Sequence, residues 1–230
     1  MQQIESLYVH YPFCSSKCHY CGFYSTIYDE SKESLYLKSL KNELTYYINN
    51  YDFRYLKTVY VGGGNPGLNP YFIIRLQEIL TSLIELKNIK EYTVECNPLN
   101  ISSVFLDNCK TSGINRISVG IQSFCDKALI FANRINQNKK VIDTAFTALK
   151  GYDFRVSIDL INYLPYSEET EELSAIEDFL IKYPFVNHLS LYDLSIDEGS
   201  FFYRELQKNS SSIFLDDSRN FSIEKEKNRL

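Results

Sequence analysis

Stretches in which apolar and polar residues alternate are separated along the chain by stretches in which apolar residues recur at helical spacing. The alternating stretches predict six strands, at 7–10, 57–61, 91–95, 114–121, 154–160 and 188–192. The stretches between them predict helices at 31–51, 71–86 and 102–110, in the region before 150, and at 168–182. Strands that alternate with helices favour right-handed βαβ units and a parallel sheet.

Each predicted strand has one apolar and one polar face. In the strand at 154–160, Val156 and Ile158 alternate with Ser157 and Asp159, and successive side chains of a strand point to opposite faces. A parallel sheet covered by helices on both sides would be apolar on both faces, and a closed barrel fills its interior with branched apolar side chains. We therefore predict a curved, partial barrel of the α/β class whose concave face is polar. A half-exposed antiparallel sheet would alternate in the same way, but the long helical connections favour parallel pairing.

Composition and charge narrow the class of protein. The chain has 230 residues, of which 44% are apolar, so it can form one domain with a sizeable core. Its net charge of −5 argues against a nucleic-acid partner. The absence of a long apolar run predicts no membrane span, and the first six residues lack the features of a secretory signal, which predicts a cytoplasmic location. The chain becomes polar near its end, so we expect a core domain at 1–206 and a polar tail or linker at 207–230.

Three of the six cysteines lie within eight residues. Cys14, Cys18 and Cys21 have the spacing C-x3-C-x2-C, and the other three are dispersed. Because cytosolic thiols stay mostly reduced, a crowded trio points to a metal or redox role. Fe–S clusters are held by Cys thiolates, ordinarily four, so three would leave one iron open to another ligand. The loop follows the first predicted strand, at the end of the sheet where α/β barrels keep their chemistry.

Two other uses of these cysteines stay open at this point. A structural zinc site would need a fourth ligand, which His10 or His19 could supply, although the usual pair of C-x2-C motifs is missing. A disulfide with one free thiol would be unusual in a reducing compartment.

The residues from Tyr8 to Cys21 have the pattern Y-x-H-x-P-F-C-x3-C-x-Y-C. This pattern resembles the cluster loop of radical S-adenosylmethionine (SAM) proteins. In particular, it resembles the branch that contains heme chaperones and oxygen-independent coproporphyrinogen III dehydrogenases. The resemblance extends to about Arg204. It implies a partial (β/α)6 TIM-like barrel with parallel strands, a [4Fe–4S] cluster on the three cysteines, and SAM as the second cofactor.

The resemblance also implies contacts with SAM from a glycine-rich turn. Residues 62–66, G-G-G-N-P, resemble the family motif G-G-G-T-P, which contacts the methionine end of the cofactor. This implies contacts from Gly63, Gly64 and Asn65, where Asn65 replaces the family threonine. Glycine lets a backbone approach a ligand closely, although an ordinary turn would have the same composition.

Three polar residues near strand ends match further motifs of the family. Glu95 lies in E-C-N-P, which resembles E-x-N-P, and Gln122 lies in a segment that resembles R-x-S-x-G-x-Q-S-F. Asp159 lies in a segment that resembles I-D-L-I-x-G-L-P, in which Tyr163 replaces the glycine. The resemblance implies that these three side chains contact the cofactor. Without it, each would be an ordinary polar residue of a strand.

Three more contacts are implied outside the strands. Arg134 matches the arginine of the family motif G-R-x-H, whereas Asn133 and Asn136 depart from it. The guanidinium of Arg134 could bind the cofactor carboxylate through two hydrogen bonds. Tyr8 and Tyr20 flank the cysteines and match positions that pack near the adenine and the methionine. Core packing is the alternative for both tyrosines.

The two members of this branch imply different functions. Dehydrogenases carry a further cysteine shortly after the third, but here Gly22 and Phe23 follow Cys21. We therefore favour a heme-binding and heme-delivering protein that cleaves SAM with an electron from the cluster. The implied partners are heme or a porphyrinogen, a heme-receiving protein, and an electron donor such as a flavodoxin or ferredoxin. The alternatives are the dehydrogenase, and a truncated cluster-binding remnant without catalysis, since the family continues into a C-terminal domain.

Overall fold

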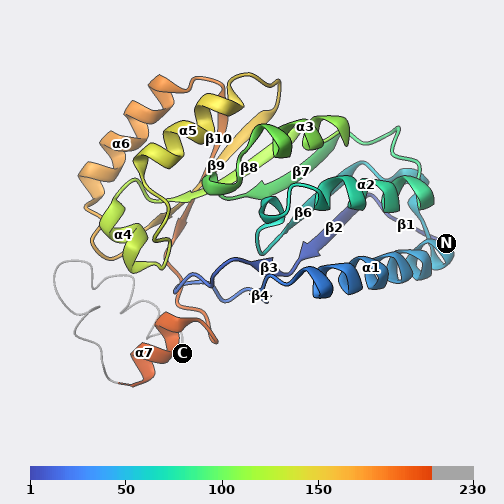
Figure 1. Cartoon of the computed structure of the whole chain (residues 1–230), viewed down its shortest axis with the longest axis horizontal. Helices are drawn as coiled ribbons and strands as arrows, with labels where there is room; N and C mark the ends of the chain where they lie inside the picture. Colours follow the sequence, from blue (N-terminus) through green and yellow to red (C-terminus); the bar gives the residue numbers. More distant parts are fainter. Residues whose placement is uncertain (209–230) are drawn as a thin grey trace.

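The computed structural model describes residues 1–208, and its centre is one six-stranded sheet (Figure 1). The order of the strands is β10-β9-β8-β7-β6-β2, and every pairing between them is parallel. The six strands are β2 (Ser6–Tyr11), β6 (Thr58–Gly63), β7 (Glu91–Cys96), β8 (Arg116–Gln122), β9 (Arg155–Asn162) and β10 (Val186–Asp193). The predicted parallel α/β architecture is confirmed, and the antiparallel alternative is wrong.

Helices connect the strands, and local sequence signals fix where most of them begin. They are α1 (Glu30–Asn50), α2 (Phe72–Leu83), α3 (Ser103–Thr111), α4 (Asp126–Phe131), α5 (Lys139–Leu149), α6 (Glu169–Lys182) and α7 (Phe201–Gln207). Side-chain oxygens of Asp29, Ser102, Asn138 and Ser200 cap α1, α3, α5 and α7 by accepting backbone N–H hydrogen bonds. The sequence predicted the helices between strands but not α7.

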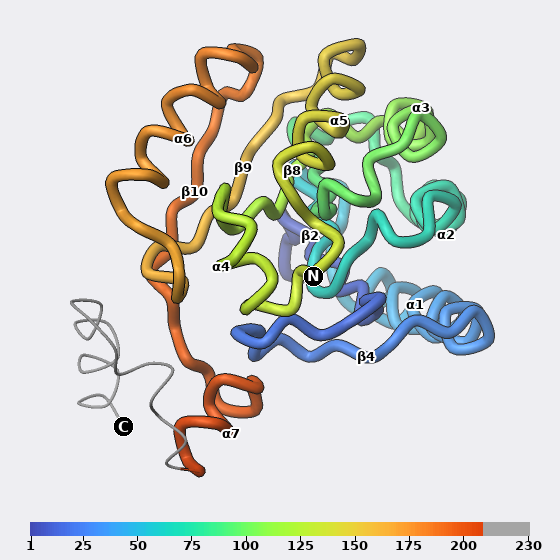
Figure 2. The backbone as a smooth tube through the Cα atoms, turned by 60° about the vertical axis from the view of Figure 1, so that its left-hand side comes forward, coloured from blue at the N-terminus to red at the C-terminus, as the bar shows by residue number. Residues whose placement is uncertain are grey.

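Figure 2 shows α1, α2, α3, α5 and α6 as an outer arc around the strands. The apolar face of the sheet packs against this arc. In β8, Ile117, Val119 and Ile121 are fully buried, as are Phe72 and Leu76 of α2. Burying such a side chain contributes about 1.5–3 kcal/mol, so this layer supplies most of the stability of the fold.

The polar face of the sheet changes along the strands. Thr93, Ser118 and Ser157, which lie toward the amino ends of β7, β8 and β9, are buried. Glu95 and Asp159, two residues further along their strands, line a cavity. The predicted polar concave face is therefore packed with small hydroxyl side chains at one end and open to a ligand at the other.

β10 departs from the predicted pattern. Leu189 and Leu191 lie on the face that is apolar in the other strands, yet they are 38% and 49% exposed. Edge position alone is not the reason, because β2 is the other edge strand and its Val9 and Tyr11 are buried. Within residues 1–208 the one helix after β10 is α7, which packs against a smaller, separate core and not against this face. Alternation alone could not predict which strand face a helix covers.

A second, smaller core lies apart from the main one. Its buried members are Ala128, Ala132, Leu164, Leu194, Ile196 and Phe202. Tyr20 from the cysteine loop packs against this core, so α4, the ends of β9 and β10, and α7 together support the loop. The expected tail at 207–230 lies almost wholly outside the described residues. In the described part of the chain, no helix is long and apolar enough to span a membrane.

Candidate cluster and cofactor site

The carboxyl-terminal halves of the parallel strands surround one cavity of about 670 Å³. Gly63, Glu95, Gln122, Asp159 and Asp193, from β6 to β10, all line it. Ligand pockets commonly have volumes of about 300–1,000 Å³. α/β barrels carry their active sites at this end of the sheet, which is also where the cysteine loop lies.

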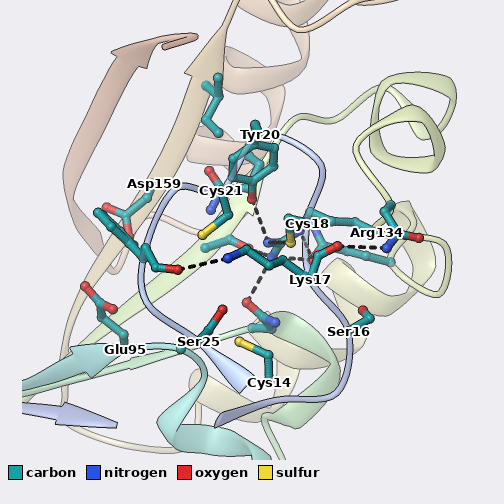
Figure 3. Close-up of a pocket in the computed structure, with 18 of the residues that line it drawn as sticks. Cys14, Ser16, Lys17, Cys18, Tyr20, Cys21, Ser25, Glu95, Arg134 and Asp159 are labelled. Atoms are coloured by element: carbon teal, nitrogen blue, oxygen red, sulfur yellow. Dashed lines mark hydrogen bonds between the residues drawn. The ribbon is translucent and has the colours of Figure 1, made fainter. Parts of the chain in front are cut away.

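The cysteine loop is closed at its base by a short parallel pairing of β3 (Phe13–Cys14) with β4 (Thr26–Ile27). The backbone N–H of Tyr28 donates to the carbonyl oxygen of Cys14 at 3.0 Å, and that of Cys21 donates to Cys18 at 3.2 Å. All three sulfur-bearing residues line the cavity. In Figure 3 their sulfur atoms lie between Glu95 and Asp159 on one side and Arg134 on the other.

Segments that are distant in sequence hold this loop in place. The side-chain amide of Asn133 donates to the carbonyl oxygen of Lys17 at 2.8 Å. The backbone N–H of His19 donates to Ala132 at 3.1 Å, and that of Phe202 donates to His19 at 2.9 Å. Asn133 has a positive φ of 62°, a conformation that asparagine tolerates better than most residues. Its replacement of the family glycine therefore keeps the turn and adds a hydrogen bond to the loop.

The chemistry of the donor set fits an iron–sulfur cluster. Burial and then the neighbouring thiols Cys18 and Cys21 raise the pKa of Cys14 to about 11, and burial also raises the pKa of Cys21. Thiols must lose their protons to ligate a metal, and cationic iron offsets the repulsion between the resulting thiolates. Three thiols that line one cavity are therefore suited to a shared, positively charged centre.

Neither histidine that could complete a zinc site lines the cavity. The ring nitrogens of His10 lie 3.0 Å from the hydroxyl oxygen of Tyr8 and 2.9 Å from the carbonyl oxygen of Tyr24, and Nδ1 of His19 lies 2.8 Å from the carbonyl oxygen of Phe131. A structural zinc site needs four ligands, so the residues of the cavity fit the cluster better than the zinc alternative.

Arg134 brings a buried positive charge to the cavity. Its Nη1 lies 3.6 Å from the sulfur of Cys18 and 3.0 Å from the hydroxyl oxygen of Tyr20. Its Nη2 donates to Asn97 Oδ1 at 2.9 Å. Burial opposes the charged form, but interactions with Tyr20 and Cys18 outweigh it, so the net shift of the pKa of Arg134 is upward. The guanidinium is therefore charged and lies beside a predicted cluster ligand.

Glu95 is held by two hydrogen bonds at the floor of the cavity. The hydroxyl of Tyr60 donates to Glu95 Oε1 at 2.6 Å, and the backbone N–H of Gly63 donates to Oε2 at 3.1 Å. Burial raises the pKa of Glu95, while these two hydrogen bonds oppose the shift. Gly62 permits the approach, because a Cβ there would lie 2.8 Å from the carboxyl carbon of Glu95. A fixed carboxyl group of this kind can accept hydrogen bonds from a bound cofactor.

The glycine turn runs directly against the start of the cysteine loop. The backbone N–H of Gly64 donates to the carbonyl oxygen of Tyr11 at 2.7 Å. A Cβ at Gly64 would lie 2.5 Å from the carbonyl oxygen of Phe13, so no other residue fits without a shift of the backbone. Gly63 has a φ of 108°, which favours glycine. Both glycines line the cavity.

The structure brings ten of the twelve predicted site residues together in this cavity. They are Cys14, Cys18, Cys21, Tyr20, Gly63, Gly64, Glu95, Gln122, Arg134 and Asp159. Asn65 and Tyr8 do not line it. Asn65 is buried and donates to Asn100 Oδ1 at 2.6 Å, and Tyr8 is exposed, with its hydroxyl 3.0 Å from His10 Nδ1.

Three cavity residues were not assigned a role from the sequence. Tyr60 positions Glu95, Asn97 bonds to Arg134, and Gln137 bonds to the same guanidinium. Tyr60 could have been found, because it occupies a polar-face position between two valines. Gln137 gave no signal, because its contact depends on the path of the loop after α4.

Three thiols beside a buried guanidinium, at the open end of a partial parallel barrel, define an iron–sulfur protein with room for a second cofactor. The chain belongs to the radical SAM superfamily, whose family model matches residues 8–178. Members of this superfamily use a [4Fe–4S] cluster and SAM, so the cofactor prediction is confirmed.

Individual relatives agree with this assignment. The chain is 31% identical over 204 residues to the heme chaperone HemW of Lactococcus lactis, covering 88% of this chain and 52% of the relative. It is 30% identical over 207 residues to the mitochondrial radical S-adenosyl methionine domain-containing protein 1 of Bos taurus, covering 90% and 46%. The chain thus spans about half the length of the curated relatives it matches.

A solved structure supports the fold. The coproporphyrinogen III oxidase HemN of Escherichia coli aligns with a TM-score of 0.72 and 23% identity, over 93% of this chain and 53% of that one. The predicted partial barrel is therefore confirmed as the fold of this chain.

Proposed function

We propose that this chain binds SAM at its cluster and handles heme, as a protein of the heme chaperone type. The support from relatives is that those named heme chaperones match about nine-tenths of this chain. The support from the site is that Gly22 and Phe23 follow Cys21, without the further cysteine expected of a dehydrogenase. Position 22 has little room for any side chain, because a Cβ at Gly22 would lie 2.5 Å from Cβ of Asp197.

The observation that carries the heme proposal is an apolar rim on a polar cavity. Four exposed apolar residues line the cavity beside the polar strand ends: Phe23, Leu99, Ile135 and Tyr192. Large apolar side chains exposed together commonly mark a ligand or partner surface. A planar, largely apolar macrocycle with charged edge groups suits such a rim.

The residues of the cavity have separate roles in this proposal. Cys14, Cys18 and Cys21 ligate three irons, and Arg134 binds the carboxylate of SAM. Glu95 and the other polar strand ends, Gln122 and Asp159, orient the cofactor through hydrogen bonds. Gly63, Gly64 and Tyr20 contact the cofactor closely. Tyr8 and Asn65 do not line the cavity, and they act through their neighbours His10 and Asn100. When bound and reduced, the cluster supplies the electron that cleaves the sulfonium bond of SAM.

The proposed partners follow from this chemistry. A reduced flavodoxin or ferredoxin is the proposed electron donor, and a heme-receiving protein is the proposed acceptor. We place the function in the cytoplasm, because cysteines that ligate iron must stay reduced.

Anaerobic reconstitution tests the radical part of the proposal. The protein with iron and sulfide restored should form 5′-deoxyadenosine from SAM when a reductant is added. A cluster that forms without any 5′-deoxyadenosine would favour the alternative of an inert cluster-binding protein.

Heme titration tests the second part. Hemin added to the same sample should produce a saturable Soret shift, and the double variant F23A/Y192A should weaken binding at least several-fold. The matched control is I181A/Y46A, which removes exposed apolar side chains from the outer helices instead. Equal effects of the two double variants, or no Soret shift at all, would contradict heme handling. Conversion of a porphyrinogen would favour the dehydrogenase.

A further inference from the structure

Arg134 is a buried cation without a carboxylate partner. Its residue is only 9% exposed, and none of the ion pairs in the described part of the chain includes it. Its oxygen partners are the neutral atoms Tyr20 Oη, Asn97 Oδ1, Gly120 O and Gln137 Oε1. The sulfur of Cys18 lies 3.6 Å from Nη1, but a Cys18 thiolate would share its charge with the cluster iron. Burying a charge without a full counter-ion is costly, so the arrangement suits an anion from outside the chain.

Gln137 makes the most constrained of these contacts. Its Oε1 accepts from both Nε and Nη2 of Arg134, at 3.2 and 2.9 Å. Its Nε2 donates to the backbone carbonyl oxygen of Ile121 in β8. The side chain is almost fully buried. It therefore bridges a central strand of the sheet to one edge of the guanidinium.

We propose that Gln137 is a positioning residue for SAM: it fixes the guanidinium of Arg134 through a neutral oxygen and leaves its charge for the cofactor carboxylate. This inference rests on the proposed contact between Arg134 and SAM. An amide is the side chain that meets both needs at this position. It accepts from the guanidinium without neutralising it, and it donates to Ile121 at the same time.

Two substitutions separate the added charge from the lost hydrogen bonds. Gln137→Glu keeps the size and the acceptor for Arg134, loses the donor to Ile121, and adds a carboxylate that would pair with Arg134 and compete with SAM. Gln137→Met keeps the approximate size and removes both hydrogen bonds, which loosens the guanidinium without neutralising it. Gln207→Glu is the matched control, because it adds the same charge at an exposed position in α7.

The test compares two ligands that differ at the carboxylate. Affinities of the reconstituted full chain for SAM and for 5′-methylthioadenosine, which lacks the amino-acid end, are measured by equilibrium dialysis. Gln137→Glu should weaken SAM binding about tenfold, the scale of one charge-assisted contact. Gln137→Met should weaken it less, and the affinity for 5′-methylthioadenosine and the iron content should stay unchanged in both variants. Gln207→Glu should match the wild type throughout.

The outcomes separate the two hypotheses. If the wild type binds SAM no better than 5′-methylthioadenosine, the contact between Arg134 and the carboxylate is wrong, and the role of Gln137 falls with it. If the wild type discriminates but Gln137→Glu leaves SAM binding unchanged, or weakens both ligands equally, only the positioning role is overturned. A general loss of fold would also weaken binding of both ligands equally, and circular dichroism of each variant would identify it.

Discussion

The loop cysteines and the core cysteine of this molecule have different surroundings. Cys14, Cys18 and Cys21 lie in one loop and line the cavity, whereas Cys109 is fully buried in the apolar core. Cys96, at the end of β7, is buried and also borders the cavity. Burial raises the pKa in both regions, so acidity does not distinguish them. The difference is the surroundings: the loop thiols lie near one another and near Arg134, while Cys109 lies among apolar side chains. The residues around a thiol therefore decide whether it ligates a metal or packs.

The largest expected effect is the loss of the cluster when a loop cysteine is removed. Each of Cys14→Ala, Cys18→Ala and Cys21→Ala should lower the bound iron from about four atoms to near zero, because two thiolates rarely retain a cubane. Iron analysis and visible absorption after anaerobic reconstitution would measure this. Cys125→Ala is the control and should keep its cluster, since Cys125 bonds to the carbonyl oxygen of Tyr166 instead. Full iron content in all three loop variants would contradict the assignment.

The core cysteine should show the opposite behaviour. Cys109→Ser places a hydroxyl at a fully buried apolar site and should lower the free energy of unfolding by about 1–3 kcal/mol. The cluster content of the folded protein should not change. Urea unfolding measures the first quantity and iron analysis the second. If Cys109→Ser lost its cluster while its free energy of unfolding stayed unchanged, Cys109 would not be a purely structural cysteine.

A smaller effect is expected where the loop is held from a distance. Asn133→Gly relieves the positive φ but removes the hydrogen bond to Lys17, so the stability of the fold should change by less than about 1 kcal/mol. The cluster should be lost faster, and we expect iron release to a chelator to accelerate about threefold. Asn88→Gly, in an exposed turn away from the cavity, is the control. Equal release rates in both variants would show that the contact with Lys17 does not protect the cluster.

The smallest effect concerns backbone strain, which also lies on the cavity side. Within residues 1–208, the non-glycine residues with positive φ are Gln122, Asn133, Tyr163 and Tyr166. Tyr163 has a φ of 64° where the family has glycine. Tyr163→Gly should therefore raise the free energy of unfolding by up to about 1 kcal/mol, whereas Tyr163→Ala, which keeps the strain, should not. A destabilised glycine variant in thermal unfolding would show that the contacts of the tyrosine outweigh the strain.

Much of the fold could be predicted, because it depends on local periodicity. The alternation around Val156 and Ser157 predicted strands with one polar face, and the helical connections predicted their parallel order. The cavity residues that lie on strands, such as Glu95 and Asp159, followed from the same alternation together with the family motifs. These parts depend on sequence neighbours only.

The parts that could not be predicted depend on contacts between distant segments. The role of Gln137 requires that a loop after α4 reach the carbonyl oxygen of Ile121. The support of the cysteine loop requires α7, which carries no strong helical pattern and begins at Phe201. The exposure of Leu189 depends on which strand faces the helices cover, which periodicity does not encode.

The hydrogen bonds from Asn133 to Lys17 and from Phe202 to His19 can form only late in the synthesis of the chain. The cysteines leave the ribosome well over a hundred residues before the segments that will hold them. At roughly 5–20 residues per second, the three thiols of a nascent chain stay unsheltered for about ten seconds or more. Iron and sulfide are thus best delivered after translation, and oxygen has its easiest access to this protein before it has finished being made.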